Sequence, residues 1–241
     1  MKTTNLIGMG VLAFACGAAC AGPMKEPHFD VLIEVVGGTL ATAAIGEDED
    51  PASIVPGVRV FPAELGEFPF GPGQGDEPGF QGFNFPQGVT FTFDIRSALG
   101  EWNGSEVVVS DNTMTVAASL ADPGLPNVTS GAGFVPGFVF TSAGADGRIH
   151  QHVELGLNSA LTTDIGVYVL ELQVSAPGYG TTPAFWFVLN NGASEEAHDA
   201  AVEWVELNLV PTPGAAAAMG LAGAAMLRRR RSGGGRAVST W

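Results

Sequence analysis

Cysteine is nearly absent from this sequence of 241 residues, and its two cysteines, Cys16 and Cys20, both lie within the first 20 positions. A basic start, an apolar core and the small residues at 19–21 predict a signal peptide over residues 1–21, removed by signal peptidase. A lipoprotein signal acylated at Cys20 is the alternative, but Gly17 stands where a large aliphatic residue is expected. Removal of the signal leaves a mature chain without cysteine, which excludes disulfide bonds and thiol catalysis.

Basic side chains are also scarce between the two ends of the chain. Residues 22–209 contain all 25 acidic side chains of the sequence. They contain only four basic ones, Lys25, Arg59, Arg96 and Arg148. Such a charge field repels nucleic acid and anionic lipid and concentrates cations near the surface. We therefore expect no nucleic-acid partner, although solubility outside the cell explains the acidity equally well.

The apolar run near the C-terminus is short. Residues 215–227 are mostly Ala and Gly and number 13, below the about 17 residues that cross a bilayer comfortably. A proline motif precedes the run, and an arginine cluster that favours the cytoplasmic side follows it. The flanking residues are Val210, Pro211, Thr212 and Pro213 before the run, and Arg228, Arg229, Arg230 and Arg231 after it.

This order of motif, short helix and arginine cluster resembles the sorting signal of PEP-CTERM proteins, which are substrates of exosortase. The resemblance implies that residues 210–231 engage exosortase, and that the short transmembrane helix anchors the chain transiently in the inner membrane. It also implies a secreted or cell-envelope protein, in the periplasm or on the outer surface. Thr212 stands where the family usually has Glu, and residues 232–241 continue as a tail beyond the arginines. An ordinary tail anchor is the alternative.

Residues 22–209 are long enough for a single domain with a proper core and too short for two comfortable ones. Alternating apolar and polar residues at 29–35 predict a strand, which returns at 39–45 across Gly37 and Gly38. Further strands are predicted at 58–61, 89–95, 106–109, 113–118, 138–141, 148–157, 166–175 and 184–190.

After the last predicted strand, the period changes to that of a helix. Ser194 is its expected N-cap, and the helix is predicted to run to about Asn208. We therefore predict an all-β fold, a jelly-roll-like β-sandwich with one C-terminal helix. The Gly- and Pro-rich residues 62–88 show no periodicity and are predicted to form a long surface loop.

The common catalytic motifs are missing from the sequence. It contains no Gly-x-Ser-x-Gly elbow, no His-Glu-x-x-His and no phosphate-binding loop, so we do not expect an enzyme. Calcium is possible, because Asp48, Asp50, Asp76 and Glu77 offer oxygen ligands in predicted loops, although no Asp-x-Asp-x-Asp-Gly loop is present.

The four histidines form a more specific pattern. His28 and Asp30 share one side of the first predicted strand, His150 and His152 share one side of a later one, and His198 is on the inward face of the predicted helix. Imidazoles two positions apart on a strand have Cα atoms about 6.6 Å apart and project the same way, so both can reach one ion. We therefore hypothesise a zinc site built from these five residues. The alternative is a set of scattered polar residues plus one satisfied core histidine.

The body of the chain is similar to a PEP-CTERM subfamily that is repressed by the zinc-uptake regulator. The similar pieces are residues 28–32, 58–61, 76–80, 150–152, 166–168 and 185–204. This resemblance implies an envelope protein made when zinc is scarce, and all four histidines fall inside the similar pieces. The alternative function is a non-catalytic structural or glycan-binding module of the extracellular matrix, with exopolysaccharide as partner and Trp102 and Tyr179 as sugar-stacking residues.

The sorting motif predicts cleavage within residues 210–214. Mass spectrometry of the protein isolated from the cell envelope is expected to show a chain that ends there. A mature chain that still ends at Trp241 would contradict exosortase processing and leave the tail-anchor interpretation.

Overall fold

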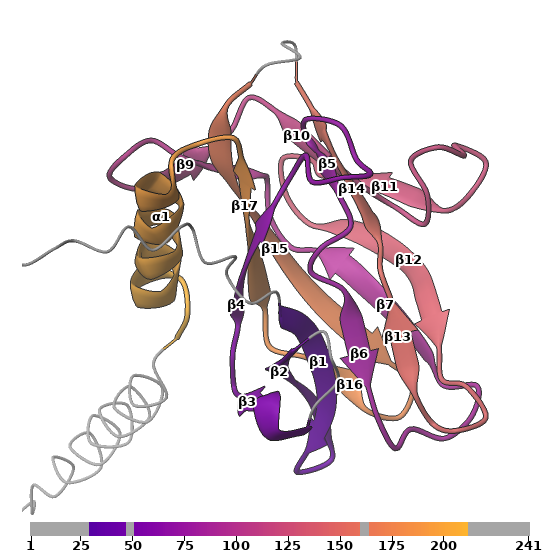
Figure 1. Cartoon of the computed structure of the whole chain (residues 1–241). Helices are drawn as coiled ribbons and strands as arrows, with labels where there is room; N and C mark the ends of the chain where they lie inside the picture. The colour runs from indigo at the N-terminus through magenta and orange to yellow at the C-terminus, as the bar shows by residue number, and fades with distance from the viewer. Residues whose placement is uncertain (1–28, 47–50, 160–163, 212–241) are drawn as a thin grey trace, which may run out of the picture.

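The computed structural model describes residues 29–46, 51–159 and 164–211, and these residues form three β-sheets with one α-helix against them (Figure 1). Sheet A has the order β13 (Ile149–Gln151), β6 (Phe80–Gly82), β1 (Phe29–Val36), β2 (Thr39–Gly46) and β3 (Val55–Pro56). Sheet C has the order β11 (Asn127–Thr129), β10 (Thr113–Ala117), β14 (Glu154–Asn158) and β5 (Gln74–Gly75). A short 3-10 helix, η1 (Pro51–Ser53), precedes β3.

Sheet B is the largest of the three. Its main path has the order β12 (Val135–Ser142), β7 (Thr90–Ile95), β15 (Gly166–Ala176), β17 (Phe185–Asn191) and β4 (Val60–Glu64). The short strands β8 (Gly100–Trp102), β9 (Val107–Val109) and β16 (Gly180–Thr181) extend it. Buried side chains of all three sheets meet in one core cluster, for example Ile33 of sheet A, Val116 of sheet C and Phe187 of sheet B. The predicted all-β sandwich with one helix is therefore confirmed.

The clearest period-two segments form strands as predicted. β1 and β2 pair along their full length, and Gly37 and Gly38 between them have φ angles of 61° and 89°, which favour glycine. In β7 buried and half-buried residues alternate, with Phe91, Phe93 and Ile95 in the core. The alternation therefore matches the burial of β7, whereas in β1 Asp30 and Leu32 are buried as well and Val35 is exposed.

Residues 62–88 differ from the predicted surface loop. β4 continues to Glu64, and β5 and β6 lie within the segment, where Phe80 and Gln81 are buried. β6 pairs in parallel with β1, so it is an interior strand of sheet A. Strands of two or three residues are too short to show a period, which explains why the sequence pattern missed them.

Residues 148–157 also differ from the prediction of a single strand. They form β13 in sheet A and β14 in sheet C, with His152 and Val153 between the two strands. The chain changes sheets at these two residues while the apolar alternation continues through them. As a result, His152 lies just beyond the end of β13 rather than within a strand.

The helix α1 (Glu195–Asn208) has the bounds that the sequence predicts. The hydroxyl of Ser194 accepts a hydrogen bond from the backbone N–H of Ala197 at 3.4 Å, and acidic residues occupy the first turn. Its buried residues His198, Ala201 and Val205 face sheet B, where Ala201 and Val205 pack against a second apolar cluster on the outer side of that sheet.

None of the helical segments described here has the length and apolar character needed to cross a membrane. Val210 is half-buried against the second apolar cluster and is followed by Pro211. The rest of the predicted sorting signal, with Thr212, Pro213 and the arginines 228–231, lies outside the described residues, as do the predicted signal peptide and the tail 232–241.

Phe187 is fully buried between the sheets, with its ring 5.9 Å from that of Phe80 and 6.4 Å from that of Phe61. We expect Phe187→Ala to lower the free energy of unfolding by about 3–5 kcal/mol, because it removes buried apolar contacts and leaves a cavity. Urea denaturation followed by circular dichroism measures this. Val109→Ala, at a position that is 76% exposed, is the control and should change stability by less than about 0.5 kcal/mol. Equal free energies of unfolding for Phe187→Ala and Val109→Ala would contradict the placement of Phe187 in the core.

Candidate metal centre

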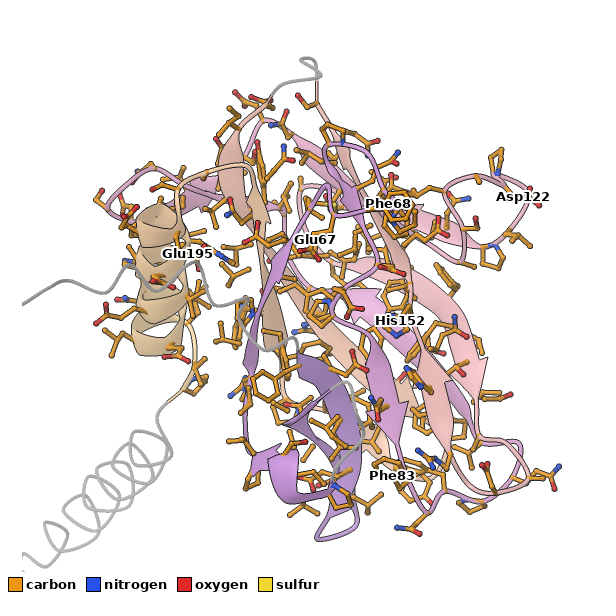
Figure 2. The ribbon with its side chains drawn as sticks, in the orientation of Figure 1. Glu67, Phe68, Phe83, Asp122, His152 and Glu195 are labelled. Atoms are coloured by element: carbon orange, nitrogen blue, oxygen red, sulfur yellow. The ribbon has the colours of Figure 1, made fainter. Side chains whose placement is uncertain are left out.

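Three neighbouring strands of sheet A place polar side chains on its outer face. Gln81 of β6 pairs with His150 of β13 on one side and with Leu32 of β1 on the other. Because side chains alternate along a strand, Asp30, Gln81 and His150 point away from the core face that carries Val31, Phe80 and Ile149. His152 follows β13 directly, and Figure 2 shows it beside β6 and β13, across the molecule from α1.

The two imidazoles and the carboxylate of Asp30 converge. The Nε2 atoms of His150 and His152 lie 3.2 Å apart, and Nε2 of His150 lies 3.8 Å from Oδ2 of Asp30. One ligand atom from each of the three residues lies within 4.8 Å of the others, a spacing at which one ion can contact all three. The side chain of His150 is 46% exposed, so the cluster is open to solvent on that side.

Asp30 is 1% exposed and is held by two hydrogen bonds. Its Oδ1 accepts from the backbone N–H of Gly79 at 2.8 Å, and its Oδ2 accepts from the side-chain amide of Gln81 at 2.7 Å. The amide oxygen of Gln81 has no hydrogen-bond partner among the described residues and is buried, which costs about 1–3 kcal/mol. The hydrogen bond to Asp30 therefore orients the side chain of Gln81, although its buried amide oxygen then lacks a hydrogen bond from the described residues.

Gly79 lies against both Asp30 and His152. A Cβ at this position would be 2.7 Å from Oδ1 of Asp30 and 2.6 Å from Cε1 of His152, closer than real Cβ contacts. Only glycine allows the backbone to approach Asp30 closely enough for the hydrogen bond while the imidazole remains in place.

The hydrogen bonds of His152 determine which of its nitrogens faces the cluster. Nδ1 lies 3.1 Å from the carbonyl oxygen of Asp76 and 3.3 Å from Oε1 of Glu77. A carbonyl oxygen only accepts, so Nδ1 carries the hydrogen, and Nε2 faces His150. A histidine that donates from one nitrogen to a carbonyl or carboxylate and offers the other to an ion is the usual arrangement of a metal-binding histidine.

The acidic surroundings favour a positive charge on His152. The hydrogen bond to Glu77, together with the charges of Glu77 and Asp30, raises the pKa of His152 to about 9, although burial opposes this rise. Burial and repulsion from Glu77 raise the pKa of Asp76. In the metal-free protein the imidazolium of His152 therefore balances the carboxylates at neutral pH, and a bound cation would displace that proton.

The structure brings together three of the five predicted ligands, Asp30, His150 and His152. His198 does not belong to this cluster, so the prediction that it joins them is wrong. It faces sheet B from α1, and its close carboxylates are Glu64 and Glu195. The inward face of the helix was predicted correctly, but the pattern could not tell which sheet the helix covers. His28 lies outside the described residues.

The residues that fix Asp30 and His152 were largely missed by the sequence pattern, because they lie in the segment predicted as a surface loop. Asp76 and Glu77 were candidates for calcium, and the structure places the carbonyl oxygen of Asp76 and the carboxylate of Glu77 at Nδ1 of His152. These three residues also form a group that could hold a metal ion. The other two calcium candidates, Asp48 and Asp50, lie outside the described residues. The short run from Asp76 to Gly79, with two acids before Pro-Gly, is the one sequence signal that marks this segment.

The two predicted sugar-stacking residues both pack against other aromatic rings. The ring of Trp102 lies 6.3 Å from that of Trp204, and the ring of Tyr179 lies 5.7 Å from that of Phe85 at 90°. Both are half-buried rather than open platforms. The structure therefore gives no aromatic support to the glycan-binding alternative at these two positions.

Neither the protein-family models nor the curated protein sequences compared with this chain give a match. Among solved structures, a family 123 glycoside hydrolase from Clostridium perfringens, studied for glycolipid glycan hydrolysis, is similar at 11% identity with a TM-score of 0.25. The similarity covers 55% of this chain and 23% of that one. This chain thus spans less than a quarter of that protein, and similarity at this level supports no functional argument.

The raised pKa of His152 predicts a pH dependence of stability. Because the folded pKa of about 9 exceeds the ordinary value of 6.5, the stabilisation is complete below about pH 6.5 and is lost as pH rises through about 9. The shift corresponds to roughly 3 kcal/mol, and solvent screening at this 31% exposed side chain reduces that to about 1–2 kcal/mol.

Urea denaturation of the metal-free protein at several pH values, compared with His152→Gln, measures this contribution. The parent is expected to lose its advantage over the variant between about pH 6.5 and 9. Two stability curves that run parallel over this range would contradict the ion pair of His152 with Glu77.

Proposed function

We propose that this protein is a non-catalytic, exported envelope protein that binds a divalent metal ion, zinc, through Asp30, His150 and His152. The observation that supports the proposal is the convergence of these three side chains, with Nδ1 of His152 held by a carbonyl and a carboxylate. His28, two positions before Asp30, remains a proposed further ligand.

The donor atoms favour zinc over calcium. Two imidazole nitrogens and one carboxylate oxygen match the ligands that zinc accepts, whereas calcium takes six to eight oxygens. Three protein ligands leave one tetrahedral position for water or a further side chain. Zinc would supply the positive charge that the proton on His152 provides in its absence, so binding should release that proton below about pH 9.

Export and sorting are part of the proposal and rest on the two ends of the sequence. The signal peptide 1–21 and the motif 210–231 would take the domain through signal peptidase and exosortase to the cell envelope. The acidic domain between them would raise the local concentration of cations around an open metal site. A structural or glycan-binding module of the matrix is the function that remains if no metal binds.

Zinc binding measured by calorimetry at neutral pH tests the site directly. The double variant His150→Ala/His152→Ala is expected to bind one zinc equivalent fewer per chain than the parent, because both imidazoles are lost. Circular dichroism should remain that of a β-sheet protein, since both side chains lie outside the main core. Unchanged zinc stoichiometry in the double variant, or no zinc bound by the parent, would refute the site.

Gly79→Ala tests the geometry without removing any ligand. The added Cβ clashes with Asp30 and His152, so zinc affinity should fall at least tenfold. Gly71→Ala is the matched control, because a Cβ there meets nothing within 4 Å, and it should bind zinc as the parent does. Equal losses in the two glycine variants would show that a general effect on folding, rather than the site, is measured.

A further inference from the structure

A second cluster of ligating side chains lies on the outer face of sheet B, where α1 covers it. His198 of α1, Glu64 of β4 and Glu195 in the first turn of α1 each bring a ligand atom within 4.8 Å of the others. His198 is 5% exposed, and its Nδ1 lies 3.2 Å from Oε1 of Glu64. Figure 2 shows Glu195 on α1, well away from His152.

The tautomer of His198 follows from its other nitrogen. Nε2 lies 3.0 Å from the backbone carbonyl of Val188, which only accepts, so Nε2 carries the hydrogen. Nδ1 is then the atom that faces the carboxylate of Glu64. A nitrogen lone pair and a carboxylate oxygen at 3.2 Å repel each other unless a cation lies between them, either a proton or a metal ion.

The oxygen of Glu64 that faces His198 is also held by a second side chain. The buried side chain of Asn190 donates to Oε1 of Glu64 at 3.1 Å, and its own oxygen accepts from the backbone N–H of Ala193 at 2.8 Å. Glu64 is therefore aimed at His198 by a residue of β17. Such outer-shell hydrogen bonds orient the ligands of metal sites.

Glu195 completes the cluster and is exposed, so the site has an entry from solvent. A cation at the N-terminus of a helix is opposed by the helix dipole, and the carboxylates of Glu195 and Glu196 offset that field. The cluster thus has a fixed imidazole nitrogen, an oriented carboxylate and a reachable third ligand, which are the requirements for a bound divalent ion.

We propose that Glu64, Glu195 and His198 form a second divalent-metal site, separate from the one in sheet A, which fastens the start of α1 to sheet B. One nitrogen and two oxygens form a harder ligand set than that of Asp30, His150 and His152, so this site should bind zinc more weakly. Occupancy would join β4, through Glu64, to the helix that precedes the predicted sorting signal.

Zinc calorimetry in the His150→Ala/His152→Ala background isolates this site in the full-length protein. One zinc equivalent is expected to remain, and Glu195→Gln in that background should weaken it at least tenfold. Glu203→Gln, which removes the same charge from an exposed position on the same helix, is the control and should leave the affinity unchanged. Because Glu195 is exposed, its replacement should not impair folding.

Amide hydrogen exchange distinguishes zinc bound at α1 from zinc bound at another place on the protein. Zinc should slow amide exchange in the first turns of α1 in the double-histidine background, and Glu195→Gln should abolish that effect. If the double variant binds no zinc while the parent binds one equivalent, the second site is refuted and the first stands. If zinc binds but neither Glu195→Gln nor Glu64→Gln weakens it, a proton rather than a metal links His198 to Glu64.

Discussion

A carboxylate buried in sheet A imposes the main constraint on this structure. Asp30 is 1% exposed, and an isolated charge at such a position is strongly unfavourable unless hydrogen bonds and a nearby cation compensate for it. The hydrogen bonds come from Gly79 and Gln81, and the positive charge comes from His152 or from an ion in its place. These requirements are met because β6 lies beside β1, residue 79 is glycine and β13 ends before His152.

The two histidine clusters apply the same physical rule on opposite outer faces of the sandwich. In each cluster, one imidazole nitrogen donates a hydrogen bond to a backbone carbonyl oxygen, and carboxylates lie near the histidine. The carbonyl oxygen belongs to Asp76 for His152 and to Val188 for His198. Each cluster also joins a segment outside the antiparallel hairpins to a sheet. The segment 76–79, which precedes β6, is held to sheet A and α1 to sheet B, so these polar contacts add to the strand pairing of β6 and to the apolar packing of α1.

Local sequence patterns predicted those features of the fold that are themselves local. β7 and the second half of β15 bury alternate residues, so their sequences show the period of a strand, and Ser194 marks the start of α1. The site was only partly predictable. The spacing of His150 and His152 showed that they could share an ion, but the approach of Asp30 depends on the order β13-β6-β1, which no local pattern encodes. Likewise, the amphipathic pattern of α1 showed that His198 points inward without showing which sheet it meets.

The parallel pairing of β4 with β17 also affects how the domain can assemble. Val60 pairs with Trp186, and Asn190 pairs with Glu64, so one edge of sheet B joins residues from near the two ends of the domain. Loop-closure entropy makes such long-range pairing slow compared with hairpin formation. The domain therefore has high contact order: β1 and β2 can form a hairpin early, whereas sheet B is complete only when nearly the whole chain is available.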